Sequence, residues 1–195
     1  MGRPSQQEQK RRELIPVIAR AFTELGYRGA TTAELARRCG VQENILYRVW
    51  PDKKAMFLAA IEFVYEFSES TWLSVLESGG DGDPARRILE FESRHHGEFG
   101  HYRILFTALG ETDDAEIREA ARRIFGRFHR FLRAQIAARS RRSRRALAPP
   151  ELTAWAAIGL GTAANIGREL GLLGDAERRR LMSTIGRVLL EGEAS

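Results

Sequence analysis

The stretch AELARRCGVQENILYRVW, residues 33–50, decides the fold, because it predicts two short helices joined by a tight turn. Thr31 or Thr32 is suited to cap the first helix, and Gly40 is suited to end it. Pro51 stops the second helix. Four apolar residues of the second helix can face inward: Ile45, Leu46, Val49 and Trp50. The stretch is therefore typical of a helix-turn-helix.

Helices are predicted on both sides of this stretch. Ser5 followed by Glu8 is a capping-box pattern, and apolar residues then recur at helical spacing as far as Gly26. Pro16 is awkward there, so this helix either kinks or begins later. Six more helices are expected, at about residues 53–78, 84–99, 102–110, 115–138, 151–170 and 175–190. The fold class is all-α with about nine helices, three in a head and six in a larger body.

Composition limits the class of protein. A chain of 195 residues with 43% hydrophobic and 29% charged residues has room for one domain, or one domain and a small appendage. The single cysteine, Cys39, excludes an internal disulfide and a cysteine-based zinc site. The polar start of the chain and the lack of any run of 18 apolar residues favour a cytoplasmic protein with no membrane segment.

The positive charge is concentrated at the N-terminal end. The net charge of +5 divides into +5 for residues 1–58, −4 for residues 59–138 and +4 for residues 139–195. A basic N-terminal segment beside an acidic middle indicates that the first segment faces a polyanion. The arginine-rich stretch 139–145, RSRRSRR, could also bind nucleic acid or an anionic membrane, but its place in the body favours a solvated loop.

Motifs in the first third of the chain resemble the tetracycline-repressor (TetR) family of bacterial transcriptional regulators. From about Arg12 to Phe57, the segments AFTELGYRGATTAELARRCGV and LYRVWPDKKAMF carry Gly-Tyr, Thr-Thr, Gly-Val, Leu-Tyr and Pro-x-Lys elements in the family's order and spacing. The sequence departs from the pattern in the second short helix, at Glu43, Asn44, Ile45, Val49 and Trp50. These departures leave the operator sequence open.

The resemblance implies a domain organisation and a function. Residues 1–52 would be a DNA-binding domain and residues 53–195 an effector-binding and dimerisation domain. The expected protein is a repressor that binds double-stranded DNA at a palindromic operator as a homodimer and is released by an unknown small-molecule effector. No cofactor is expected.

Candidate DNA-binding residues fall into two groups. Donor and acceptor side chains that could read base edges lie at the start and on one face of the second short helix: Gln42, Glu43, Asn44 and Arg48. The resemblance assigns phosphate contacts to Tyr47, to Lys53, and to Thr31 or Thr32 at the N-terminus of the first short helix. Arg37 and Arg38 are either phosphate contacts or a solvated face. Thr32 could instead be an N-cap, and Tyr47 a packing residue.

Two further sets of residues are expected in the body. Aromatic and histidine side chains that could line an effector cavity are Phe91, His95, Tyr102, Phe106, Phe125, Phe128, His129 and Trp155. The two closing helices are expected to form a four-helix bundle with those of a second subunit through Gly159, Ala163, Gly167, Leu181, Ile185, Val188 and Leu189.

The alternative is a helical enzyme, or a metal-binding or small-molecule-binding protein, that does not bind DNA. No nucleophile elbow, P-loop or dinucleotide-binding motif occurs, so the sequence offers no candidate catalytic residues. His95, His96 and His101 lie near Glu92 and Glu98, but adjacent histidines point to different faces of a helix. No metal site is therefore assigned, and Cys39 is expected in the core rather than as a redox sensor.

Overall fold

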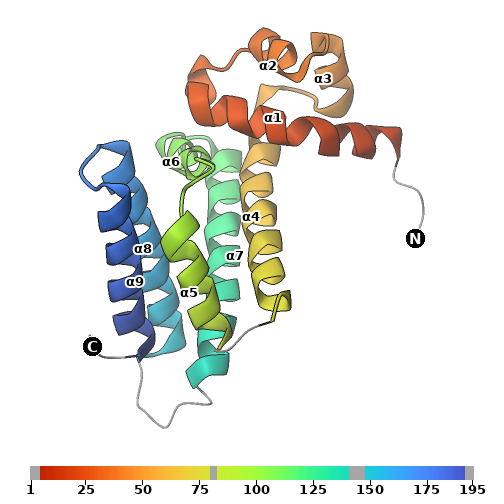
Figure 1. The fold of residues 1–195 in the computed structure, drawn as a ribbon. Helices are drawn as coiled ribbons and strands as arrows, with labels where there is room; N and C mark the ends of the chain where they lie inside the picture. Colours follow the sequence, from red (N-terminus) through yellow and green to blue (C-terminus); the bar gives the residue numbers. More distant parts are fainter. Residues whose placement is uncertain (1–4, 80–82, 141–147, 192–195) are drawn as a thin grey trace. The chain divides into compact units, whose positions relative to one another are not determined.

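The computed structural model describes residues 5–79, 83–140 and 148–191, apart from the Ser140 side chain, and these residues form helices without strands (Figure 1). The predicted all-α class is confirmed. The helices are α1 Gln6–Gly29, α2 Thr32–Cys39, α3 Glu43–Val49, α4 Lys53–Glu77, α5 Pro84–His95, α6 Tyr102–Gly110, α7 Ala115–Ser140, α8 Pro150–Glu169 and α9 Asp175–Glu191. Over the described ranges, no helix is both long and apolar enough to cross a membrane.

Side-chain caps set where several helices begin. The Ser5 hydroxyl accepts a hydrogen bond from the Glu8 amide at 3.1 Å, which confirms the predicted start of α1. Carboxylates accept backbone amides in the same way in front of α4, α5 and α7, at Asp52, Asp83 and Asp114. Each cap satisfies an amide that has no partner inside its helix.

The first helix ends close to the predicted position. Gly26 adopts a left-handed backbone with φ 70°, so the regular part of α1 stops there and a short helical turn continues to Gly29. Pro16 lies inside α1, where Gly26 is the residue with non-helical dihedral angles. The turn at Gly26, and not the proline, therefore redirects the chain.

Packing divides the described chain into two compact units. The first unit comprises residues up to 67 together with residues 99–124, and the second comprises residues 68–98 together with residues 125 onward. The helices α4 and α7 therefore contribute to both units. This grouping differs from the predicted boundary at residue 52, because α6 packs on α1. The functional division at residue 52 stays a prediction.

An aromatic cluster forms the centre of the first unit. The Phe22 ring meets the Phe57 ring edge to face at a centroid distance of 5.0 Å, and Tyr27 lies 4.8 Å from Phe57. Buried apolar residues of the same unit come from four helices: Leu14, Ile18, Leu35, Leu46 and Met56. Trp50 is also buried, and its indole N–H has no acceptor among the described residues.

In the second unit α9 packs against both α5 and α8, as Figure 1 shows. The core contains Ala85, Ile136, Ala154 and Leu190, with Leu89 and Leu132 packed against it. Arg139 forms ion pairs with Asp83 and Glu191, which connect the end of α7 to α5 and α9. Gly186 allows the close approach of α9 to α5, because a Cβ atom at this position would lie 2.2 Å from Leu89 Cδ1 and 3.0 Å from Leu89 Cγ.

We expect Gly186→Ala to destabilise the protein by about 1–3 kcal/mol, because the added methyl group overpacks the contact with Leu89. The control is Gly126→Ala in α7, where the nearest atom is the end of the flexible Arg130 side chain at 3.3 Å. There the higher helix propensity of alanine should stabilise by up to about 1 kcal/mol. Urea unfolding of both variants tests this, and equal stabilities would contradict it.

Candidate nucleic-acid interface

The helix-turn-helix predicted from residues 33–50 is present as α2, a tight turn and α3. Gly40 has φ 64°, and its amide donates to the carbonyl of Arg37 at 3.2 Å. The Val41 amide donates to the Ala36 carbonyl at 3.0 Å. Leu35 and Leu46 are fully buried, one from each helix. This packing fixes α3 on α2 and determines which side of α3 faces outward.

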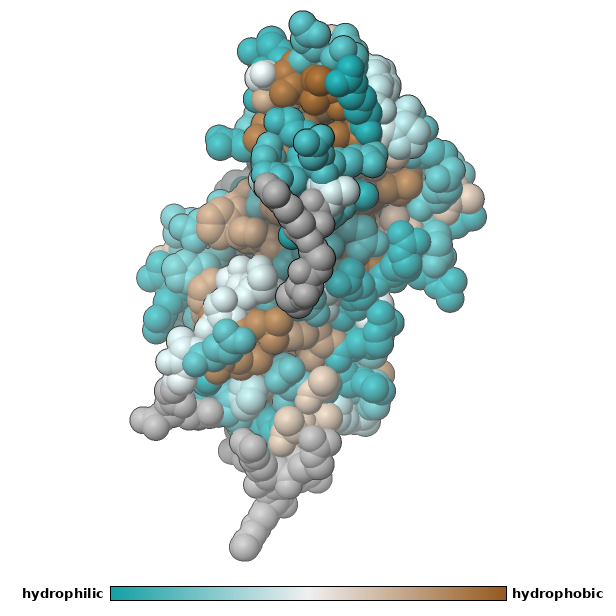
Figure 2. Space-filling model, turned by 90° about the vertical axis from the view of Figure 1, so that its right-hand side faces the viewer, coloured by the Kyte–Doolittle hydropathy of each residue, from teal (hydrophilic) through white to brown (hydrophobic). Residues whose placement is uncertain are grey.

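All four candidate base-reading residues, Gln42, Glu43, Asn44 and Arg48, are exposed. Gln42 caps α3 without a side-chain hydrogen bond to the helix. The Arg48 carbonyl accepts a hydrogen bond from Gln7 Nε2 at 2.9 Å, which leaves the guanidinium group out of that contact. Hydrophilic residues surround small hydrophobic patches where α2 and α3 lie, at the top of Figure 2. Their contacts with bases stay a prediction.

The two adjacent threonines have different roles. Thr31 is the N-cap of α2, with its hydroxyl 3.2 Å from the Glu34 amide. Thr32 is the first residue of the helix and its hydroxyl accepts a hydrogen bond from the Tyr47 hydroxyl at 3.2 Å. The N-cap alternative for Thr32 is wrong, and Tyr47 is 47% exposed rather than packed inside.

Lys53 is held in place at the start of α4. Its ammonium group donates to the Tyr27 carbonyl at 3.0 Å and lies 4.7 Å from the centroid of the Tyr27 ring. A lysine ammonium has three N–H donors, so this arrangement leaves donors for another acceptor. The contact of Lys53 with a phosphate stays a prediction.

Arg37 and Arg38 are paired with carboxylates of the same unit. Arg37 Nε lies 2.7 Å from Glu34 Oε2, and Arg38 pairs with both Glu34 and Glu24. Hydrogen bonds from Arg37 and then Arg38 lower the pKa of Glu34 to about 2. A phosphate would have to compete with Glu34 for these guanidinium groups.

The predicted effector-cavity residues fall in both units. Tyr102 and Phe106 lie in the first unit, at a centroid distance of 5.8 Å from each other. The other six lie in the second unit, where Phe91 contacts His95 at 4.7 Å and His129 stacks on Trp155 at 4.8 Å. None of the eight lines the polar pocket of the second unit described below, so their role stays a prediction.

The predicted dimer residues differ in exposure. Gly159, Ala163 and Ile185 are exposed, whereas Leu181, Val188 and Leu189 are partly buried. Gly167 is buried within its own unit, because a Cβ atom there would lie 2.6 Å from Leu173 Cδ1. Residues spaced by four drift around a helix, so Gly167 does not share the outer face of Gly159.

His95 and His101 have different surroundings, and the buried Nδ1 atom of His101 has no hydrogen-bond partner among the described residues. His95 pairs with Glu98 at 2.9 Å, and the buried side of His101 lies among Phe63, Phe67 and Phe99. Burial lowers the pKa of His101 and raises that of Cys39. Among the residues that the structure describes, no three histidine, cysteine, aspartate or glutamate side chains are arranged to hold a metal ion.

Part of the predicted arginine-rich loop lies outside the described residues, which omit 141–147. Sequence reasoning also missed a group of arginines in the second unit: Arg168, Arg178 and Arg179. The run of three arginines at 178–180 indicated a concentration of positive charge. The meeting of Arg178 and Arg179 with Arg168 depends on the packing of α8 and α9, which the sequence does not show.

Comparison with known proteins matches the N-terminal segment to a family of bacterial regulatory proteins. Residues 14–60 match the model described as bacterial regulatory proteins, tetR family. The chain is 30% identical over 135 residues to the nucleoid occlusion factor SlmA of Vibrio campbellii, covering 66% of this chain and 67% of that protein. It is 30% identical over 79 residues to the HTH-type transcriptional regulator BetI of Klebsiella pneumoniae, covering 40% of each.

The whole fold has solved counterparts. The crystal structure of a transcriptional regulator of the TetR family from Cytophaga hutchinsonii superposes with a TM-score of 0.80 at 17% identity, covering 99% of this chain and 98% of that one. This likeness covers the described helices of both units and shows the fold. The matched segment spans only 29% to 40% of the length of several other curated relatives, among them the BetI protein above.

The Glu34 ion pairs predict a pH dependence. The folded-state pKa of about 2 lies below the unfolded value of about 4.3, so the stabilisation is complete above the unfolded value and is lost as the pH falls toward 2. Glu34→Gln should lower the melting temperature at pH 7, and the difference from wild type should shrink below pH 4. Glu43→Gln, at an exposed carboxylate on α3, should change little. A constant Glu34→Gln difference from pH 7 to pH 3 would contradict the assignment.

Proposed function

The chain belongs to the TetR family of bacterial regulatory proteins, and on that premise we propose that it is a transcriptional regulator that binds double-stranded DNA. The observation that carries the proposal is the outward face of α3, on which Gln42, Asn44 and Arg48 are exposed while Leu46 anchors the helix. A helix presented in this way fits the major groove of B-DNA, and amide and guanidinium groups match the base edges there.

Backbone contacts would orient α3 on the duplex. Lys53 and the hydroxyl group of Thr32, which accepts from Tyr47 and keeps its own hydrogen, supply donors on the same unit as α3. Such contacts bind phosphates and carry no sequence information, whereas contacts from α3 select the sequence. The alternative, a helical enzyme or ligand-binding protein without DNA binding, predicts that no selected DNA sequence is preferred.

A homodimer is proposed from an exposed apolar face on α8. Large apolar side chains on this face are strongly exposed: Leu152 at 63%, Trp155 at 50%, Ile166 at 43% and Leu170 at 68%. Exposed Gly159 and Ala163 lie between them, and the spacing of three and four residues makes a continuous helical stripe. A stripe of this kind is unfavourable in water and suits the same face of a second copy.

Dimerisation and release complete the proposed mechanism. A two-fold dimer would place two α3 helices on a palindromic site with half-sites roughly 34–36 Å apart. A small-molecule effector would release DNA by binding more tightly to the conformation that does not fit the operator. The protein would act as a repressor in the bacterial cytoplasm.

Substitutions in the first unit should separate phosphate contacts from base contacts. Lys53→Ala should weaken binding to all sequences alike and reduce the salt slope by about 1, whereas Arg48→Ala should cost about 1–3 kcal/mol and relax preference at particular base pairs. Fluorescence anisotropy with DNA selected from a random pool measures both. Arg187→Ala on α9 is the control and should change neither. Uniform weakening by Arg48→Ala would contradict its base-reading role.

A charge in the apolar face should separate the subunits. Ala163→Arg is expected to give a folded monomer at micromolar concentration, because residue 163 is exposed within its own chain and an arginine there would be buried unpaired in the dimer. Ala134→Arg, at an exposed position of α7, is the matched control and should stay dimeric. Light scattering measures the mass, and a monomeric wild type would refute the dimer.

A further inference from the structure

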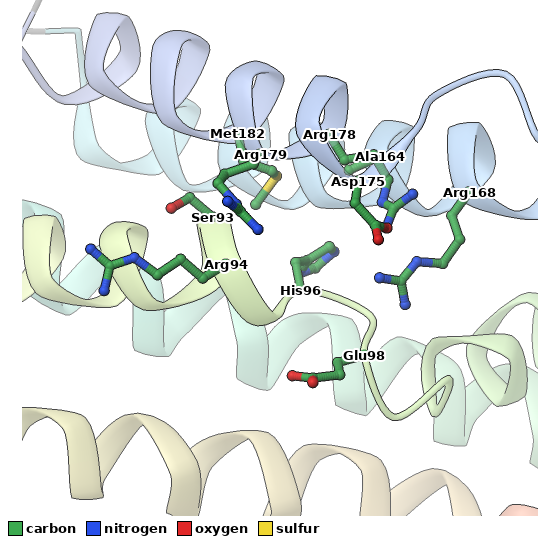
Figure 3. Close-up of a pocket in the computed structure, with 10 residues that line it drawn as sticks. All are labelled: Ser93, Arg94, His96, Glu98, Ala164, Arg168, Asp175, Arg178, Arg179 and Met182. Carbon is green, nitrogen blue, oxygen red and sulfur yellow. The ribbon is translucent and has the colours of Figure 1, made fainter.

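A polar pocket lies entirely within the second unit. It has a volume of about 250 Å³ and is formed by the end of α5, the turn that follows it, α8 and the first turns of α9 (Figure 3). The residues that line it are Ser93, Arg94, His96, Glu98, Ala164, Arg168, Asp175, Arg178, Arg179 and Met182. This lining is unlike the aromatic cavity predicted from the sequence, because charged side chains predominate.

The charges of the pocket are unequal. Four arginines face two carboxylates, and both carboxylates already have partners: Asp175 pairs with Arg178, and Glu98 lies 2.9 Å from His95 Nδ1. Arg168 donates to the neutral carbonyl of Gly97. Among the described residues, the side chain of Arg179 has neither an ion pair nor a hydrogen-bond partner. The pocket therefore has uncompensated positive charge.

His96 forms a fixed wall of this pocket. Its Nδ1 lies 2.6 Å from Glu92 Oε2 and its Nε2 lies 3.0 Å from the Gly161 carbonyl oxygen. These two contacts hold the imidazole ring between α5 and α8. Trp72 Nε1 donates to the other oxygen of Glu92 at 2.6 Å. The two oxygens of Glu92 are thus directed to Trp72 and His96 and form no ion pair with the arginines of the pocket.

The arginines approach the pocket from two helices. Figure 3 shows Arg179 extending from α9 toward Ser93 and His96, and Arg168 extending from α8 toward the turn after α5. Arg178 is largely buried, with 12% of its side chain exposed, beside the start of α9. The N-terminal end of a helix carries partial positive charge, which adds to that of the guanidinium groups.

We propose that this pocket binds a small anion through a carboxylate or phosphate group held by Arg168, Arg178 and Arg179. Guanidinium groups bind the oxygens of carboxylates and phosphates in a bidentate manner, and an ion pair with a largely buried arginine is screened less than one in water. The volume lies below the roughly 300–1,000 Å³ of drug-sized ligand sites, so the ligand is a small metabolite. The bound group competes with Asp175 for Arg178. This proposal concerns ligand binding and is independent of DNA binding.

Calorimetric titration of the full chain with inorganic phosphate and, separately, with succinate tests the proposal. We expect at least one of the two anions to bind, and the tighter one identifies the group that the pocket selects. Arg179→Gln should weaken that binding by about tenfold or more, the usual effect of losing a hydrogen bond to a charged group. Asp175→Asn should tighten it, because Arg178 loses its competing carboxylate.

Arg180→Gln is the matched control. It removes the same charge from the next residue of α9, which is exposed and does not line the pocket, so the affinity should not change. Arg179 is itself exposed, and circular dichroism should show that both variants keep the wild-type fold. Absence of binding by both anions, or equal weakening by Arg179→Gln and Arg180→Gln, would overturn the proposal.

Discussion

The left-handed turn at Gly40 is the constraint on which the candidate interface depends. Gly40 has φ 64°, and the amides of Gly40 and Val41 donate hydrogen bonds to carbonyl groups of α2, so that α3 can begin at Glu43. A residue that carries a Cβ atom rarely adopts this backbone conformation. The short connection and the burial of Leu35 and Leu46 hold α3 on α2. The outward position of Asn44 and Arg48 follows from this packing.

Local chemistry made much of the fold predictable from the sequence. The caps at Ser5 and Asp52 and the helix-ending glycines at Gly26 and Gly40 act within a few residues, so the sequence contains what determines them. The helix-turn-helix was predictable for the same reason. The sequence could not tell which of Thr31 and Thr32 caps α2, because this depends on where the backbone changes from extended to helical. In the structure the change follows Thr31, and the Thr32 hydroxyl instead accepts a hydrogen bond from Tyr47.

Features that depend on distant contacts were not predictable. Gly167 has the same spacing as Gly159 and Ala163, but the chain turns back after α8 and Leu173 covers it. The polar pocket brings Arg168 to Arg179 and both to the end of α5, and no periodicity in the sequence indicates this meeting. The sequence likewise left open whether Arg37 and Arg38 are solvated, whereas the structure pairs them with Glu34 and Glu24.

The fixed position of Lys53 has a thermodynamic consequence. A free lysine side chain loses up to about 2 kcal/mol of rotamer entropy when it becomes ordered. Here the Tyr27 carbonyl and ring already restrict the ammonium group in the folded protein. Much of that entropy is lost during folding, so association with a polyanion removes less of it. Under the proposed phosphate contact of Lys53, Tyr27 would contribute to affinity through the order that it imposes on its neighbour, without touching the DNA itself.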